Sequence, residues 1–250
     1  MKEKNERKRA VVMGASSGMG LEVARRLLGD GWHVALAARR TEAMEKLKEE
    51  FPLLVDGVRA IDVTHGDAPQ QLLRLIEELG GMDLYFHSSG IGKQNMELDA
   101  STEEQTMMTN AVGFTRLIDT AFNYFAGHGG GHIAAITSIA GTKGLGAAPA
   151  YSATKSLQGT YLQALEQQAR MRRLDIRITD IRPGFVDTPL LGDDRRYPML
   201  IKPEKAARQI MDAIYRQRHV RIIDGRYRVL VALWRLIPNW AWRKLGIRNS

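Results

Sequence analysis

Short apolar runs of strand length alternate with amphipathic stretches of helical length along most of this chain. The runs that predict strands are Arg9–Met13, Trp32–Ala38, Val58–Val63, Asp83–His87, His132–Thr137 and Ile176–Ile181. The stretches that predict helices are Met19–Gly29, Thr41–Phe51, Asp67–Leu79, Thr102–Phe125, Tyr151–Arg173 and Pro203–Arg218. Strands separated by helices of about ten residues or more favour βαβ units, whose right-handed crossovers cover both faces of a parallel sheet with helices. We therefore predict an α/β fold, a single domain with a doubly wound parallel β-sheet.

The first predicted strand runs directly into a glycine-rich loop, Gly14-Ala-Ser-Ser-Gly-Met-Gly20, and a helix follows. Glycines between a strand and a helix allow a tight turn and let backbone N–H groups approach a pyrophosphate at the helix N-terminus. The spacing is G-x-x-x-G-x-G and differs from the G-x-G-x-x-G of other dinucleotide-binding folds. The loop predicts a nucleotide site, and the alternative is a plain glycine-rich turn.

The end of the second predicted strand bears on which dinucleotide would bind. Folds that prefer NAD place an acidic residue about 20 residues after the glycine loop, where it holds the ribose 2′-hydroxyl. Here the strand ends at Ala38, and Arg39 and Arg40 follow. Because a guanidinium binds phosphate through two hydrogen bonds, these residues favour NADP(H) over NAD(H). The alternative is that both arginines begin a solvated helix.

Tyr151 and Lys155 stand four residues apart at the start of a long predicted helix, so they share one face. Lowering the pKa of a phenol from about 10 to about 7 costs roughly 4 kcal/mol, and one cation at about 4 Å supplies about that much. We therefore expect Tyr151 to act as a general acid toward a carbonyl oxygen. Ser138, at the end of another predicted strand, would hydrogen-bond the same oxygen.

Together these motifs resemble the short-chain dehydrogenase/reductase family over about Lys8 to Arg218. The matching segments are Gly14–Gly20, Asp62-Val63, His87-Ser-Ser-Gly90, Asn110, Ser138, Tyr151 with Lys155, and Arg182–Thr188. The order of the motifs and the 13-residue step from Ser138 to Tyr151 are those of the family. The resemblance implies a Rossmann-type fold and an enzyme that transfers hydride between NADP(H) and a carbonyl or alcohol.

The resemblance also implies roles for individual residues. Tyr151 would be the proton donor, Ser138 the ligand of the substrate oxygen, and Lys155 the group that lowers the tyrosine pKa and holds the nicotinamide ribose. Asn110 would bind, through its backbone carbonyl, a water that links Lys155 to solvent. Asp62 would hydrogen-bond the adenine beside Val63. The expected cofactor contacts are Gly14, Ser16, Ser17, Gly18, Met19, Gly20, Arg39, Arg40, Asp62, Val63, Ser89, Gly90, Tyr151, Lys155, Pro183, Gly184, Val186 and Thr188.

Two segments depart from the family pattern. Met13 replaces the usual threonine before the first glycine, which removes a side-chain hydrogen bond between the loop and the fourth strand. His87 and Ser88 replace the usual Asn-Asn or Asn-Ala pair in that strand. We expect cofactor binding to survive both changes, and we expect His87 to be a buried core residue rather than a tuned group near the adenosine.

Charge is concentrated at the ends of the chain. The 250 residues carry a net charge of +8, but residues 216–250 alone carry +8, residues 1–10 carry +3, and residues 11–215 carry −3. No nucleic-acid recognition motif accompanies the basic ends, so we expect no nucleic-acid partner. The absence of cysteine excludes disulfides and thiolate metal sites. His128 and His132 flank three glycines that disfavour a helix, so we expect no metal site.

A basic, aromatic segment of about residues 226–250 extends beyond the family pattern. Leu230, Leu233, Trp234 and Ile237 fall on one helical face, and Pro238 then breaks the helix. Such a segment could lie on an anionic membrane, and the alternatives are that it packs on a neighbouring subunit or covers the substrate cleft. Neither a signal peptide nor an apolar run of about 20 residues is visible, so we expect a cytoplasmic protein, with peripheral contact at the inner membrane face as an option.

The sequence therefore predicts an NADP(H)-dependent oxidoreductase that acts on a carbonyl or alcohol of a small apolar, lipid-like substrate. Segments 91–98, 143–148 and 188–200 would complete the pocket, and Ile91, Met96, Leu145, Leu190, Leu191 and Met199 make them apolar. We expect a homodimer or homotetramer, paired through the long helices 102–125 and 151–173. The alternative is a non-catalytic NADP(H)-binding regulator on the same fold, which would have no need of a proton donor.

Overall fold

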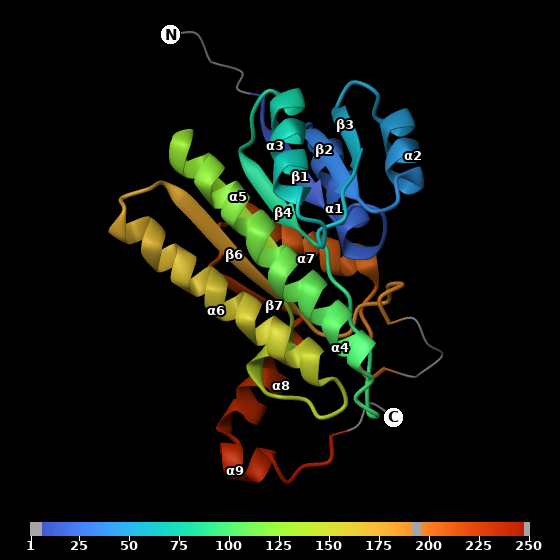
Figure 1. Cartoon of the computed structure of the whole chain (residues 1–250), viewed down its shortest axis with the longest axis vertical. Coiled ribbons are helices and arrows are strands. Elements are labelled where there is room, and N and C mark those ends of the chain that lie inside the picture. Colours follow the sequence, from blue (N-terminus) through green and yellow to red (C-terminus); the bar gives the residue numbers. More distant parts are fainter. Residues whose placement is uncertain (1–6, 192–196, 248–250) are drawn as a thin grey trace.

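The fold is built on seven parallel strands in one sheet, as a computed structural model that describes residues 7–191 and 197–247 shows (Figure 1). The strands are β1 (Arg9–Met13), β2 (His33–Ala38), β3 (Val55–Ala60), β4 (Leu84–His87), β5 (Gly131–Ile136), β6 (Ile176–Pro183) and β7 (Val220–Ile223). Their order in the sheet is β3-β2-β1-β4-β5-β6-β7. The chain therefore crosses from one half of the sheet to the other between β3 and β4, and the switch point lies between β1 and β4.

Helices cover both faces of this sheet. They are α1 (Gly18–Gly29), α2 (Glu42–Glu50), α3 (Ala68–Leu79), α4 (Ala100–Met107), α5 (Phe114–Gly127), α6 (Pro149–Met171), α7 (Pro203–Tyr215), α8 (Gly225–Leu236) and α9 (Asn239–Trp242). A π-helical turn, η1 (Met108–Gly113), joins α4 to α5, and a 3₁₀ turn, η2 (Ile139–Thr142), follows β5. The buried side chains of α3, α5 and α6 form one core with the sheet, and those of α1, α2, α7 and α8 form the other.

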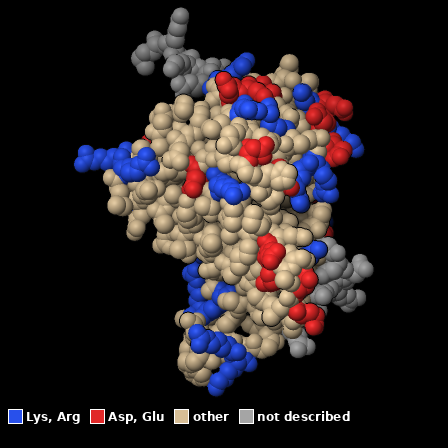
Figure 2. Space-filling model, viewed as in Figure 1, with Lys and Arg blue, Asp and Glu red and all other residues tan. Residues whose placement is uncertain are grey.

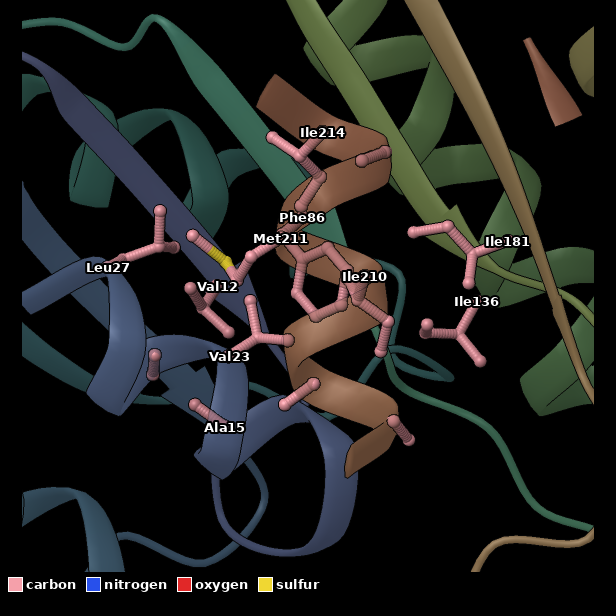
Figure 3. Close-up of a cluster of buried hydrophobic side chains, with 14 of the residues drawn as sticks. Val12, Ala15, Val23, Leu27, Phe86, Ile136, Ile181, Ile210, Met211 and Ile214 are labelled. Carbon is pink, nitrogen blue, oxygen red and sulfur yellow. The ribbon is translucent and has the colours of Figure 1, made fainter. Parts of the chain in front are cut away.

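The second of these cores shows why the sequence pattern specifies the layers. Val23 and Leu27 stand four residues apart on the inner face of α1, and Ile210 and Ile214 do the same on α7. Figure 3 shows these side chains converging with Val12 of β1 and others from β4, β5 and β6. Because β1 and β2 are buried on both faces, each reads as a continuous apolar run rather than an alternating one.

The predicted α/β class, the doubly wound parallel sheet and its two helical layers are confirmed. Three elements differ from the prediction. β3 begins at Val55 and ends at Ala60, about three residues before the predicted strand. The helix predicted over 102–125 is interrupted by η1, and β7 was not predicted at all. β7 is short and exposed at its start, as an edge strand is, so it lacks the apolar run that marks the central strands.

Candidate functional site

A cleft opens at the carboxyl ends of the strands around the switch point. Its lining comes from the loops after β1, β2, β4 and β6 and from the segment that follows β3. The residues that line it are Gly14, Ser16, Ser17, Gly18, Met19, Ala38, Arg39, Arg40, Ile61, Asp62, Val63, Ser88, Ser89, Gly90, Ile91, Thr109, Thr188, Pro189 and Leu190. The fold thus brings together twelve of the eighteen residues predicted to hold a cofactor, from segments far apart in the sequence.

The glycine loop needs glycine at its two ends. Gly14 has a φ of +88°, and a Cβ atom there would lie 2.6 Å from the amide nitrogen of Ser89. A Cβ atom on Gly20 would lie 2.1 Å from the carbonyl oxygen of Gly14. Side chains at either position would therefore push apart the loop, the start of α1 and the segment after β4. Gly20 itself does not line the cleft, so its contribution is to this packing.

The departures at Met13 and His87 leave the loop tied to β4. The amide of Ser88 donates to the carbonyl of Met13 at 2.7 Å, and the Met13 side chain is buried. His87 is wholly buried, with Nδ1 3.0 Å from the Tyr85 hydroxyl and its ring edge-to-face with Phe114. Burial, and next the charge of Lys155, lowers the pKa of His87 to about 3. His87 is therefore a neutral core side chain, and backbone hydrogen bonding replaces the tie that the family's threonine makes.

Arg39 and Arg40 follow β2 directly and are exposed at the edge of the cleft. Neither guanidinium forms an ion pair with a carboxylate among the described residues. Ala38, buried at the strand end, puts no acidic side chain at the end of β2 itself. The cleft thus carries two cations at the end of β2.

Asp62 lies in the cleft beside Val63, but it also caps its own turn. Its Oδ1 accepts hydrogen bonds from the backbone amide of Thr64 at 2.9 Å and from the Thr64 hydroxyl at 2.8 Å. Burial alone would raise the pKa of Asp62, but these bonds and the charge of Arg39 lower it. Asp62 is therefore an ionised, fixed acceptor, and its capping role accounts for part of its hydrogen bonding.

Ser138, Tyr151 and Lys155 come together where β5 ends and α6 begins. Ser138 is the residue before η2, and its Oγ accepts from the amide of Ala140 at 3.1 Å. Lys155 is buried, and its Nζ lies 5.8 Å from the centre of the Tyr151 ring. The same Nζ donates to the carbonyl of Ile136 at 3.2 Å, which ties α6 to the end of β5.

The ionisation of these groups differs from the prediction. Burial raises the pKa of Tyr151, and a hydrogen bond from Ser138 lowers it only in part. Burial lowers the pKa of Lys155 to about 8, against the opposing charge of Asp180. The prediction of an acidic phenol considered the cation but neglected the desolvation of the phenolate. In the chain alone Tyr151 is therefore fully protonated at neutral pH, the state in which a general acid has to start.

Asn110 lies in the π-helical turn and is wholly buried. Its side chain clamps the segment after β4: Nδ2 donates to the carbonyl of Ile91 at 2.7 Å, and Oδ1 accepts from the Ile91 amide at 2.9 Å. Such π-helical turns widen a helix by one residue and occur often at functional sites. The turn aims the backbone carbonyl of Asn110 toward α6 rather than along its own helix.

The segment after β6 closes the cleft from the other side. Thr188 lines the cleft and lies against the glycine loop, since a Cβ atom on Gly18 would be 3.0 Å from its Cγ2. Pro183 and Val186 are buried and, like Gly184, do not line the cleft. Gly184 leaves room for the ring of Tyr227, 2.3 Å from where a Cβ atom would be. Like Ser138, Tyr151 and Lys155, these three residues are not among those that line the cleft.

The profile of the short chain dehydrogenase family matches residues 8–197. The chain belongs to the short-chain dehydrogenase family.

Known relatives agree with this membership. An uncharacterized oxidoreductase of Mycobacterium tuberculosis is 29% identical over 248 residues, covering 96% of this chain and 91% of the relative. The glycine betaine reductase of Emericella nidulans is 34% identical over 229 residues, covering 84% of this chain but 18% of that larger protein. The crystal structure of a short-chain dehydrogenase/reductase from Burkholderia phymatum in complex with NAD superposes with a TM-score of 0.81 at 20% identity, covering 90% and 92% of the two chains.

One buried residue of this short-chain dehydrogenase was missed by the sequence reasoning. Gln158 is wholly buried on α6, three residues after Lys155. Its Oε1 accepts from Lys155 Nζ at 2.9 Å, and its Nε2 donates to the carbonyl of Asn110 at 2.8 Å. The i+3 spacing places Gln158 on the same face of the helix as Lys155. This spacing is the one feature of the sequence from which its role could have been predicted. Gln158 occupies the position that the resemblance assigned to a water bound by Asn110.

The predicted substrate segments meet beside Tyr151. The amide of Asn95 donates to the carbonyl of Ala147 at 2.9 Å, and the amide of Leu145 donates to the Ser152 hydroxyl at 3.1 Å. Met96, Leu98 and Leu190 are exposed on the segments after β4 and β6. Residues 192–196 of the third predicted segment lie outside the described residues. Of these apolar side chains, Leu190 lines the cleft, together with Ile91 of the first predicted segment.

Proposed function

We propose that this short-chain dehydrogenase is an NADP(H)-dependent carbonyl reductase, reversible as an alcohol dehydrogenase. The observation that carries the proposal is the placement of Ser138, Tyr151 and Lys155 at the carboxyl edge of the sheet, beside a glycine-lined cleft that carries Arg39 and Arg40. Ligands of open α/β sheets bind at this edge, at the switch point.

The residues of the cleft fit a phosphorylated dinucleotide. Gly14 and Gly18 line the cleft and hold the loop in its turn with positive φ angles, and α1 begins at Gly18, so its N-terminus faces the loop where a pyrophosphate would bind. Arg39 and Arg40 would hold the 2′-phosphate, and Asp62 with Val63 the adenine. When bound, NADPH supplies the hydride that reduces the carbonyl carbon.

Tyr151 and Ser138 supply the acid chemistry. We assign Tyr151 Oη as the donor of the proton to the carbonyl oxygen and Ser138 as the second hydrogen-bond donor to that oxygen. The raised pKa of Tyr151 keeps its proton in place until the substrate oxygen gains negative charge. Lys155 stabilises the phenolate that remains, because its buried ammonium lies beside the ring.

The substrate is proposed to be an apolar, lipid-like carbonyl compound. Ile91 and Leu190 line the cleft, and Met96 and Leu98 are exposed on the segment that follows Ile91; apolar side chains of this kind are typical of a site for an apolar ligand. We also propose a homo-oligomer paired through α4, α5 and α6, where Met107, Met108 and Leu157 are exposed. Among the described helices, none is long and apolar enough to cross a bilayer.

The test is NADPH oxidation with a panel of ketones, for the wild-type chain and for Tyr151→Phe. The variant should lose turnover by about a hundredfold or more and bind NADPH unchanged, since it removes the donated proton and little else. Tyr161→Phe is the matched control, because Tyr161 lies on the same helix and hydrogen-bonds Asp119 away from the cleft. Turnover retained by Tyr151→Phe would refute the assignment, and NADPH binding without any turnover would favour a regulator.

A further inference from the structure

The C-terminal segment, residues 225–247, has an inner face that is fixed to the domain. Tyr227 and Val231 of α8 are buried. Trp234 Nε1 donates to the Thr142 hydroxyl at 2.9 Å, and Trp242 Nε1 donates to the carbonyl of Gly144 at 2.7 Å. The two indole rings meet edge-to-face with their centres 5.7 Å apart. The segment is therefore held in one orientation, which determines what its other face presents.

The single apolar face predicted for this segment is in fact two faces. Leu230 and Trp234 pack against the core, whereas Leu233 points outward. The helix ends at Leu236, before Pro238, as expected. The sequence does not show which side of this helix packs against the domain, so the predicted face combined residues from the packed side and the exposed side.

On the outer face of the segment, the side of α8 away from the domain carries three exposed apolar side chains, Val229, Leu233 and Leu236, and Trp240 of α9 is exposed beyond the end of α8. Their exposed fractions are 60%, 60%, 78% and 68%. The first three are spaced at i, i+4 and i+7 and so share one stripe of α8. Large apolar side chains gathered in this way on an otherwise packed domain indicate an interaction surface.

Cations border this outer face. Arg228 and Arg235, seven residues apart, run along one side of the apolar stripe, and Lys244 Nζ lies 5.7 Å from the centre of the Trp240 ring. Residues 225–247 contain no aspartate or glutamate. Figure 2 shows blue side chains on the lower lobe, where α8 and α9 lie in Figure 1, and red side chains beside that lobe, at the lower right of the visible face.

We propose that this outer face docks on the surface of an anionic lipid bilayer. Apolar side chains, an interfacial tryptophan and flanking arginines are the composition that binds at the boundary between headgroups and acyl chains. A second copy of the chain fits this outer face less well than a bilayer does. A two-fold symmetric contact would bring the arginines and lysine of one copy against those of the other, with no carboxylate of this segment between them. Each cation near an anionic surface raises partitioning by about fivefold.

Docking would place the substrate side of the cleft at the bilayer. Lys143 Nζ donates to the carbonyl of Ile237 at 3.0 Å and to Asn239 Oδ1 at 2.9 Å, so the segment is attached to the loop that precedes Tyr151. An apolar carbonyl compound dissolved in the lipid would then reach the cleft without crossing water. This consequence rests on the proposed function, whereas the docking itself does not.

The experiment is co-sedimentation of the full chain with vesicles of phosphatidylcholine alone and of an equal mixture with phosphatidylglycerol. The wild-type chain should bind the mixed vesicles at least about tenfold more tightly. The variant Leu233→Ser with Leu236→Ser and Trp240→Ser should lose about tenfold or more of that binding. The pair Leu53→Ser with Met171→Ser is the control, since both side chains are as exposed but lie on other surfaces.

Equal binding by the wild-type chain and the triple variant, or no preference for anionic vesicles, would overturn the proposal. So would a wild-type dimer that the triple variant converts to a monomer while vesicle binding is absent, because the face would then be a protein interface. Turnover of a water-soluble ketone without vesicles should be the same in both chains. Vesicle binding without any ketone turnover would refute the proposed function and leave the docking standing.

A separate observation concerns Gln158, and from it we infer that this residue positions the ammonium of Lys155. Its amide orientation is fixed, because a flip would set NH₂ against the ammonium and oxygen against the Asn110 carbonyl. The other groups that face Lys155 are His87 of β4, Tyr151 on its own helix and Asp180 of β6, whose carboxylate pairs with Arg182. Gln158 bonds both Lys155 and the Asn110 carbonyl, and so links α6 to the π-helical turn.

The test compares Gln158→Leu with Gln158→Glu by following the Lys155 Cε signal in NMR titrations of the cofactor-free chain. The leucine variant removes an acceptor, so its midpoint should fall by roughly one pH unit, and the glutamate variant should raise it by a similar amount. The alkaline limb of kcat/KM should move in the same directions. Gln163→Leu and Gln163→Glu, exposed on the same helix, should move neither. An unchanged midpoint in both Gln158 variants would refute the role.

Discussion

Gly92 lies against the ring of Tyr151, and its substitution tests whether the position of that ring matters. A Cβ atom on Gly92 would lie 2.7 Å from Tyr151 Cε2 and 2.8 Å from Cδ2. The backbone of Gly92 does not need a positive φ, so alanine would disturb only the ring. We predict that Gly92→Ala lowers kcat by displacing the proton donor Tyr151, although Gly92 itself takes no part in the chemistry.

The size of the effect follows from the overlap. The ring must recede by about 0.7 Å before the contact reaches the ordinary 3.4 Å. Displacements near 1 Å at a reacting group cost about a hundredfold in rate, so we expect kcat to fall by about ten- to a hundredfold. Crowding a packed site also lowers the free energy of unfolding by about 1–3 kcal/mol.

The assay is ketone reduction at saturating NADPH, with NADPH affinity and urea unfolding measured on the same preparations. Gly146→Ala is the matched control, because no atom lies within 4 Å of its added methyl group. A Gly92→Ala variant that kept the wild-type kcat, or that lost NADPH binding to the same extent as turnover, would refute the predicted effect of the Tyr151 ring position.

Three further predictions concern the cofactor, the residue that precedes α8 and the core. Arg39→Ala should weaken NADPH binding by about ten- to a hundredfold and leave NADH binding unchanged in nicotinamide fluorescence titrations; equal losses would contradict the 2′-phosphate role. Burial alone would raise the pKa of Asp224, but hydrogen bonds from Arg226 and Lys205 lower it to about 2. Because the pKa of Asp224 is lower in the folded than in the unfolded chain, Asp224→Asn should lower the free energy of unfolding in urea by about 2 kcal/mol at neutral pH. This difference between variant and wild type should vanish as pH falls from about 4 to about 2, and a difference that stays constant with pH would contradict the stabilising role of the ionised Asp224. Ile210→Ala, wholly buried between α7 and the sheet, should cost about 2–5 kcal/mol in the same assay, whereas the exposed Leu53→Ala should cost little; equal losses would contradict the packing.

The layers of this fold could be predicted because each central strand is an apolar run and each helix repeats its apolar residues at helical spacing. β1 was predicted to the residue, since Arg9–Met13 is bounded by charge on one side and glycine on the other. The π-helical turn could not be predicted in this way. Its residues continue the pattern of α4 and α5, and the insertion shows only in where the Asn110 carbonyl points.

The candidate site was predictable to the extent that its residues form local motifs. Gly14–Gly20, Arg39, Ser138 and Tyr151 all stand at the ends of strands or starts of helices, where the fold gathers side chains at one edge. The ionisation of Tyr151 was not predictable from spacing, because the cost of burying its phenolate depends on the packing around it.

The C-terminal segment shows a second limit of sequence patterns. Its amphipathic spacing was evident, but which of its apolar residues face the domain depends on tertiary contacts. Trp234 and Trp242 turn inward because their indole N–H groups find acceptors on Thr142 and Gly144. Only the structure therefore separates the face that packs from the face that remains available.

Hydride transfer to the substrate can be followed directly with NADPH in which deuterium replaces both hydrogens on C4. With a ketone that the wild-type chain reduces, we predict one deuterium on the carbinol carbon of the product, seen by mass spectrometry, and no labelled alcohol from Tyr151→Phe. Unlabelled product from the wild-type chain, or labelled product formed at the wild-type rate by Tyr151→Phe, would contradict this prediction.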